Sequence, residues 1–181
     1  MKMRTLMSVS VLSIVPAGAV WALPSVGAPI PSATVEDADG RSLALAGLAG
    51  RPILIFYEDR ASATQNQALK DDLARLARGD RYRRAVVLVP VADVGSYDFW
   101  PAKGLVTGAI RDESRKVGTT IYCDWNGSFG RALSVTKKTS NVVLAGRNGK
   151  ILFARAGALS DPERARVLEL LRAEIGPSPS P

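Results

Sequence analysis

Three short apolar runs, separated by longer mixed segments, predict strands at the centre of a β-sheet. They cover residues 53–57, 85–91 and 119–123. The first run is nearly all apolar, which is typical of a strand covered on both faces. Pro90 is expected to stop the second strand. Segments with helical periodicity lie between the runs, so the three strands are predicted to be parallel and joined by helices.

Helices are predicted where apolar residues recur three and four positions apart. The first is expected to begin at Ser62 and to end at Gly79. Its inner face is formed by Leu69, Leu73 and Leu76. A weaker pattern predicts a helix over residues 105–117. Its inward apolar residues are expected to be Leu105, Ala109, Ile110 and Val117.

The last helix has the clearest boundaries. Ser160 is a good N-cap, and Glu163 three residues later completes a capping box. Gly176 is expected to end the helix. The buried stripe is predicted to consist of Leu168, Leu171 and Ile175.

Two hairpins complete the predicted sheet. Residues 33–35 and 41–45 form the first, and residues 141–146 and 151–155 form the second around an Asn148-Gly149 turn. Asn-Gly is favoured there because a tight antiparallel turn needs two residues with positive φ. The element order predicts an α/β protein. It resembles the thioredoxin-like three-layer sandwich, with a central mixed β-sheet flanked by helices and an extra N-terminal β-hairpin.

The two ends of the chain are predicted to lie outside this domain. Residues 1–22 read as a signal peptide, with a basic start, an apolar stretch of about ten residues and small residues before a cleavage site after Ala22. An uncleaved anchor is the alternative, although the apolar stretch is short for a membrane span. Residues 23–176 form one thioredoxin-like domain, and residues 177–181 a disordered Pro/Ser tail. The protein is therefore expected to be periplasmic or secreted, with no membrane span after cleavage.

Composition excludes several kinds of chemistry. The chain has no histidine and a single cysteine, and its three methionines all lie within the predicted signal peptide. The usual ligands of zinc, copper and haem are thus missing, and we expect no cofactor and no metal. The net charge is +7, but acidic residues interleave with the basic ones. That pattern favours a solvated surface over nucleic-acid binding.

The segment after the first core strand resembles a thioredoxin active site without its sulfur. In redox-active relatives a Cys-x-x-Cys pair lies at this strand-to-helix turn, where the helix N-terminus stabilises a thiolate. Here Ala61 and Thr64 fall at the two cysteine positions. The cis-proline that normally precedes the fourth core strand is replaced by the run Thr139-Ser140-Asn141. Both parts of the disulfide-exchange machinery are therefore absent.

The chain resembles one family in particular, the YtfJ-like periplasmic proteins. Four motifs carry the resemblance over about residues 25–175: Arg60-Ala61-Ser62-Ala63 with Asn66, Asp80-Arg81-Tyr82, Asp124 with Asn126-Gly127, and the run from Asn148-Gly149-Lys150 to Gly157-Ala158-Leu159. The resemblance implies an exported protein of thioredoxin-like fold without the redox cysteine pair. It implies no biochemical activity.

Arg60 and Ser62 allow two interpretations. Ser62 with Gln65 fits a capping box, in which the serine satisfies N–H groups at a helix start. Alternatively, the helix N-terminus and the Arg60 guanidinium form a pocket for a small anion. The neighbouring Glu58 and Asp59 are expected to be exposed charges at the rim of the sheet rather than an acid–base pair.

A loop over residues 93–104 carries Tyr97, Phe99 and Trp100. Exposed aromatic side chains in loops are frequent binding anchors. The alternative is that they fold over the sheet as a lid on the core. We include Trp100 among the candidate binding residues, together with Arg60, Ser62 and Ser140.

Cys123 lies in an apolar run and is predicted to be a packed, inert thiol. The main functional hypothesis is an exported, redox-inactive binding or accessory module whose partner is a protein of the cell envelope. The first alternative is a single-cysteine thiol oxidoreductase or peroxidase that uses Cys123. The second is a binder of an anionic ligand or polymer at Arg60 and Ser62.

Overall fold

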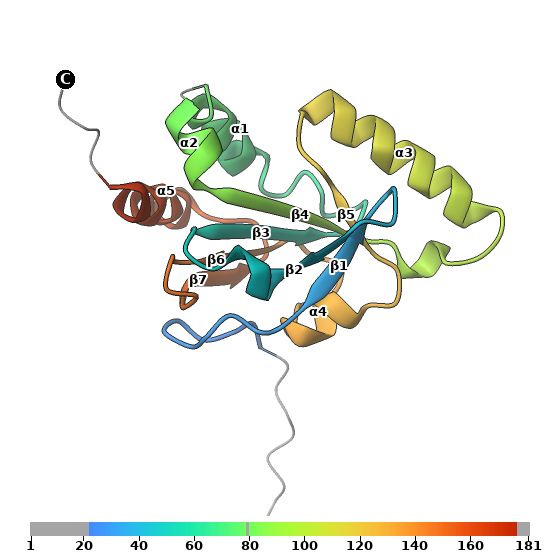
Figure 1. Ribbon diagram of the computed structural model, residues 1–181, viewed down its shortest axis with the longest axis horizontal. Helices are drawn as coiled ribbons and strands as arrows, with labels where there is room; N and C mark the ends of the chain where they lie inside the picture. Colours follow the sequence, from blue (N-terminus) through green and yellow to red (C-terminus); the bar gives the residue numbers. More distant parts are fainter. Residues whose placement is uncertain (1–21, 79, 177–181) are drawn as a thin grey trace, which may run out of the picture.

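A computed structural model describes residues 22–78 and 80–176, and these contain one seven-stranded sheet (Figure 1). Its strands are β1 (Thr34–Asp37), β2 (Ser42–Ala44), β3 (Ile53–Glu58), β4 (Val87–Asp93), β5 (Tyr122–Asp124), β6 (Asn141–Ala145) and β7 (Ile151–Ala156). The order across the sheet is β2-β1-β5-β4-β3-β6-β7. Strands β3, β4 and β5 are parallel, while β1, β2, β6 and β7 pair antiparallel with their neighbours. The predicted mixed sheet and its N-terminal hairpin are confirmed.

Helices lie on both faces of the sheet (Figure 1). They are α1 (Gln67–Leu76), α2 (Asp80–Ala85), α3 (Ala102–Val117), α4 (Ser128–Ala132) and α5 (Asp161–Ile175), with 3-10 turns η1 (Leu45–Leu48) and η2 (Gly95–Tyr97). Helices α1, α2 and α3 lie on one side of the sheet and α4 on the other. The architecture is the three-layer sandwich that the sequence predicts.

Alternation along β3 explains the two cores. Ile53, Ile55 and Tyr57 face a cluster that includes Phe129 of α4 and residues of η1. The residues between them face a cluster that includes Leu69 of α1 and residues of α5. Because side chains alternate across a strand, a wholly apolar strand such as β3 supplies both cores.

The last helix follows its sequence signals. Ser160 and Glu163 form the capping box, in which the Ser160 N–H and hydroxyl donate to the Glu163 carboxylate at 2.8 and 2.7 Å. The buried residues are Val167, Leu171 and Ile175. Leu168, expected in the stripe, is only half-buried.

Several predicted boundaries differ from the structure, and two of the differences affect the strand ends near the site. The chain makes turns after β3, and helix α1 begins at Gln67 instead of Ser62. Pro90 does not stop its strand, since β4 continues to Asp93. Pairing between β4 and β5 begins only at Val91. The proline, which has no N–H to donate, therefore precedes that ladder.

Helix α3 shows a different exposed face from the one expected. Leu105 and Val117, predicted to point inward, are 73% and 52% exposed, and the helix contains no buried residue. Its more covered apolar residues, Val106 and Ile110, are half-buried. Strand β5 is only three residues long, so it offers little apolar surface for a 16-residue helix to cover.

The predicted signal peptide and the Pro/Ser tail lie outside the described residues, apart from Ala22. Within residues 22–78 and 80–176, no helix combines the length and the apolar character needed to cross a bilayer.

Candidate functional site

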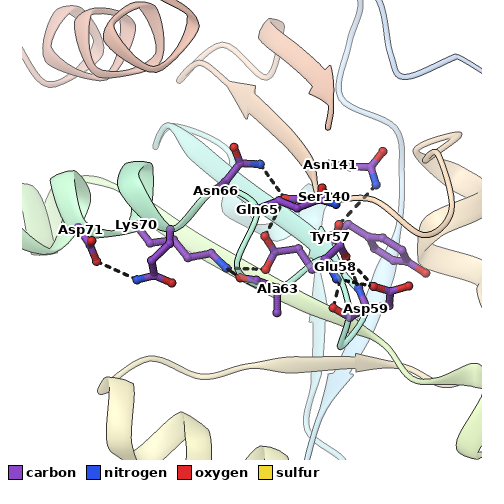
Figure 2. Close-up of polar contacts among 12 residues, drawn as sticks. Tyr57, Glu58, Asp59, Ala63, Gln65, Asn66, Lys70, Asp71, Ser140 and Asn141 are labelled. Carbon is purple, nitrogen blue, oxygen red and sulfur yellow. Dashed lines mark hydrogen bonds and ion pairs between the residues drawn. The ribbon is translucent and has the colours of Figure 1, made fainter. Parts of the chain in front are cut away.

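The carboxyl end of β3 brings distant segments together. Glu58 ends this strand, and the turn that contains Ser62 follows it. On the other side, Tyr57 pairs with Asn141 at the start of β6, so Ser140 lies next to the same strand end. Figure 2 shows the resulting cluster of polar side chains. Ser62 and Ser140 thus reach the same edge, although 78 positions separate them in the sequence.

Ser62 is fully buried and is held by the carboxylate of Asp59. The Ser62 N–H and hydroxyl donate to Asp59 Oδ1 at 2.8 and 2.7 Å, and the Asp59 N–H donates to Ser62 Oγ at 3.0 Å. The hydrogen bond from the Ser62 side chain lowers the pKa of Asp59 against the opposing effect of its burial. A carboxylate of the chain itself therefore occupies the donors that an external anion would need.

The capping box predicted for Ser62 and Gln65 does not form. Gln65 turns toward the segment before β6, where its Oε1 accepts from the Thr139 hydroxyl and the Ser140 N–H, each at 2.9 Å. This contact ties the turn after β3 to the loop that holds a cis-proline in redox-active relatives. The helix start moves because side chains of this turn satisfy one another instead of capping a helix.

Ser140 lies at the centre of a second set of contacts. It is fully buried, and its hydroxyl donates to Glu58 Oε1 at 2.7 Å and accepts from Asn66 Nδ2 at 2.9 Å. Lys70 of α1 pairs with the other Glu58 oxygen at 2.6 Å. The expectation of exposed rim charges is wrong, because Glu58 and Asp59 are both partly buried and hydrogen-bonded.

Asn66 belongs to one of the family motifs, but the sequence analysis did not assign it to the site. Its amide nitrogen donates to Ser140 and to the Gly157 carbonyl, the latter at 3.1 Å, and its oxygen accepts from the Leu159 N–H at 2.8 Å. The amide thus joins α1 to the segments before β6 and after β7. A signal was present, since Asn66 lies three residues before the buried Leu69, on the helix face that turns toward the core.

Every buried side-chain nitrogen or oxygen of the described residues has a hydrogen-bond partner. Two cavities of about 270 and 460 Å³ lie elsewhere, and none of the four predicted binding residues lines them. The cluster around Ser62 and Ser140 is therefore a closed polar contact between segments.

Arg60 and Trp100 remain at the surface. They follow β3 and β4, which run parallel and pair from Ile53 to Glu58, so both leave the same edge of the sheet. Trp100 is 90% exposed and Phe99 59%. The lid alternative is wrong, because these aromatic side chains point to solvent instead of covering the core. We call Phe99, Trp100 and Leu105 the aromatic surface.

Cys123 is buried in β5, as predicted, between β1 and β4. Burial, with a smaller contribution from the charge of Asp37, raises the pKa of the thiol to about 11. A thiol with that pKa is almost entirely protonated at neutral pH, and the protonated form is a poor nucleophile.

Comparison with solved structures gives the same fold. The chain is similar to a protein of Chlorobium tepidum assigned as a thiol:disulfide interchange protein DsbE (18% identity, TM-score 0.62, 84% of this chain and 99% of that one). It is also similar to the thioredoxin domain of a Bacteroides vulgatus thiol-disulfide oxidoreductase (14%, 0.58, 82% and 99%). A third similar structure is an exposed lipoprotein thioredoxin of Streptococcus pneumoniae (14%, 0.57, 77% and 97%). The fold is thioredoxin-like.

Comparison with sequences is more specific about the family. No curated protein matches the chain. One family profile, described as "Bacterial protein of unknown function (YtfJ_HI0045)", matches residues 59–174, from the turn after β3 almost to the end of α5. That range contains Ser62, Asn66 and Ser140 and thus most of the polar cluster. The chain belongs to this YtfJ family of bacterial proteins.

Proposed function

We propose that this protein is an exported, redox-inactive member of the thioredoxin-like fold that acts as a binding or accessory module in the cell envelope. The observation that carries the proposal is the closed polar cluster around Ser62, Asn66 and Ser140. It fills the edge where redox-active relatives hold their disulfide chemistry, with hydrogen bonds among buried side chains. The chain has one cysteine, Cys123, and this residue is buried in the sheet instead of lying at that edge.

Export is supported by the N-terminal sequence. The basic start, the short apolar stretch and the small residues before position 23 fit a signal peptide cleaved after Ala22. Cleavage at this site supports the proposal that the protein is periplasmic or secreted.

The same proposal predicts an inert thiol. In the folded protein at pH 7.5, a thiol reagent such as Ellman's should not label Cys123, and the protein should turn over neither a dithiol nor a peroxide. Full labelling should follow the addition of denaturant. With a pKa of about 11, fewer than roughly one in a thousand Cys123 side chains are thiolate at that pH.

A Cys123→Ser, Ala61→Cys double variant is the matched control for this measurement. It moves the single thiol to an exposed position of the turn after β3, and it should label within seconds to minutes. Rapid labelling of native Cys123, or turnover that Cys123→Ser abolishes, would instead support the thiol-enzyme alternative.

The aromatic surface is the proposed contact with a protein partner, and Arg60 extends it along the same edge. Trp100, Phe99 and Leu105 are 90, 59 and 73% exposed. Aromatic anchors of this size contribute much of the energy of protein interfaces because they bury a large area at little entropic cost. Ser62 and Ser140 support this edge from inside through the polar cluster and do not contact the partner themselves.

Site-specific photo-crosslinking in the exporting cell tests this surface. A photoreactive residue in place of Trp100 should give one adduct of defined mass, whereas the same residue in place of Arg147 should give none. Arg147 is an exposed control on the β6–β7 turn, at the opposite edge of the sheet. Co-expression of excess wild-type protein should suppress the adduct, while co-expression of the Trp100→Ala protein should not.

Equal adducts from both positions, or none from position 100, would refute the contact. An adduct with lipid would assign the surface to a membrane, and an adduct with a second copy of the chain would assign it to self-association. Either result would contradict contact with a different protein.

A further inference from the structure

A cavity of about 460 Å³ lies beside α4, and neither Ser62 nor Ser140 lines it. Tyr57 at the end of β3, Arg131 of α4 and the segment 135–137 contribute to its wall. Its size falls within the range of small-molecule sites in proteins. Nothing in the proposed function accounts for it.

The two basic side chains that line this cavity have no carboxylate partner among the described residues. Arg131 and Lys137 line it, and no carboxylate residue does. Arg131 donates one hydrogen bond, from Nη1 to the Asn126 carbonyl at 2.9 Å, and forms no ion pair with a described carboxylate. Lys137 has neither a hydrogen bond nor an ion pair with any described residue. Two cations beside one cavity favour an anionic ligand.

The other cavity, of about 270 Å³, shows the contrast. It too is lined by arginines, but Asp39 accepts from Arg41 and Arg111 at 3.2 and 2.9 Å, and Asp37 pairs with Arg41 at 2.7 Å. Acidic residues of the chain already neutralise those guanidinium groups. Basic lining residues without a carboxylate partner among the described residues thus distinguish the larger cavity from the smaller one.

Tyr57 supplies a neutral polar group to the cavity wall. Its hydroxyl donates to Asp124 Oδ2 at 3.1 Å, which leaves the oxygen free to accept a hydrogen bond. Burial, with the nearby charges of Asp124 and Asp93, raises the pKa of Tyr57, so the phenol itself is uncharged. The Asp124 carboxylate behind it is buried and also accepts from the Gly130 N–H at 2.8 Å. Val135 adds an apolar surface beside it.

The wall formed by residues 135–137 is fixed in place. The buried Asn141 amide accepts from the Thr136 N–H at 2.9 Å and donates to the carbonyls of Thr136 and Thr139 at 2.8 and 2.9 Å. Ser134 and Lys138, on either side of the wall, have positive φ values of 52° and 60°. Residues other than glycine keep that backbone conformation only where the surrounding structure holds them in it. The cavity is therefore preorganised, which lowers the entropic cost of binding.

We propose that this cavity binds a small organic anion. Its carboxylate or phosphate group lies between Arg131 and Lys137, and its apolar part contacts Val135. A hydroxyl or amine of the ligand can donate to the Tyr57 oxygen. The site is separate from the aromatic surface and does not depend on the function proposed for it.

Titrations followed by amide NMR of the ¹⁵N-labelled mature protein test the proposal. The probes are acetate, benzoate, inorganic phosphate and phenyl phosphate at constant ionic strength and pH. Saturable shifts are expected at Gly127, Gly130 and Thr136, with benzoate and phenyl phosphate binding more tightly than acetate and inorganic phosphate. The carboxylate and phosphate arms show which anionic group the site prefers.

Variants locate the binding. Arg131→Ala and Lys137→Glu should each lower the affinity for the tightest-binding probe by at least about tenfold. Lys150→Ala, an exposed lysine in the β6–β7 turn, should leave the affinity unchanged. Lys137 is itself exposed, so its replacement should keep the fold, and the spectrum of amides far from α4 checks this.

Three results would overturn the proposal. The first is that no probe gives saturable shifts. The second is that the shifts centre on the turn that carries Arg60. The third is that Lys150→Ala and Lys137→Glu lower the affinity for the probe equally.

Discussion

Replacement of Asn66 by alanine is expected to destabilise the protein by about 3 kcal/mol. The amide makes two donor contacts and one acceptor contact, with Ser140, Gly157 and Leu159, and the side chain is 3% exposed. Alanine leaves the Leu159 N–H and the Gly157 carbonyl without these partners. Unmet hydrogen-bonding groups in the interior cost about 1–3 kcal/mol each, and a void adds to that cost. Urea unfolding, followed by far-UV circular dichroism, measures the change.

Gln67→Ala is the matched control for Asn66→Ala. Gln67 is the next residue but is exposed, and its amide contacts only Asp71, one turn along the helix. Its loss should change the free energy of unfolding by less than about 0.5 kcal/mol. Equal effects of the two substitutions would show that the amide of Asn66 does not join the three segments as described.

Asn66→Asp separates the hydrogen bonds from the volume of the side chain. Aspartate has nearly the same size and keeps an acceptor for the Leu159 N–H, but when ionised it cannot donate to Ser140 or Gly157. It should therefore be destabilising at neutral pH and should recover part of the loss at a pH where the carboxyl is protonated and can donate again. An Asp variant as stable as the wild type at pH 7 would mean that the two donor contacts contribute little.

The fold was easier to predict from the sequence than the site. Local signals determine most of the fold, whereas contacts between residues far apart in the sequence determine the site. The strands and the last helix were predictable because their signals are local: an apolar run for β3, an Asn148-Gly149 turn, and a capping box at Ser160. The start of α1 was not predictable in this way. Ser62 has a valid capping pattern with Gln65, but Gln65 is drawn to Thr139 and Ser140, more than 70 residues away.

The local pattern also did not predict which face of helix α3 is covered by the sheet. Leu105 and Val117 have helical spacing with other apolar residues of α3, yet they face solvent. Periodicity predicts that a helix has an apolar face, but the area of sheet available beneath it decides which residues are covered. Strand β5 is short and offers α3 little apolar surface to cover, so Leu105 of the aromatic surface remains exposed.

Gly130→Ala is expected to be the most damaging of the single-methyl additions, at about 1–3 kcal/mol. An ideal Cβ at this position would lie 2.7 Å from the Tyr57 hydroxyl oxygen, 2.8 Å from Cζ of the same ring and 3.0 Å from Val135 Cγ2. These neighbours cannot withdraw easily. Tyr57 is 3% exposed, its ring stacks on Phe129 and its hydroxyl donates to the buried Asp124.

Gly104→Ala is the control that isolates this contact. Gly104 also lies in a helix, α3, but an added Cβ there would meet nothing within 4 Å. Because alanine is a better helix former than glycine, this substitution should stabilise the protein by up to about 1 kcal/mol. The two alanine substitutions should therefore shift the urea midpoint in opposite directions, and a shared direction would contradict the close packing at Gly130.

A double-mutant cycle identifies which atom resists the added methyl group. Tyr57→Phe removes the hydroxyl that lies 2.7 Å from the added Cβ, while the contact with Cζ at 2.8 Å remains. Gly130→Ala should therefore cost less in the Tyr57→Phe background than in the wild type, but should still be destabilising. Additive effects would place the strain elsewhere, for example at Val135. Because Tyr57, Gly130 and Val135 all line the larger cavity, relief of the clash by movement of the ring would also change the shape of the proposed anion site.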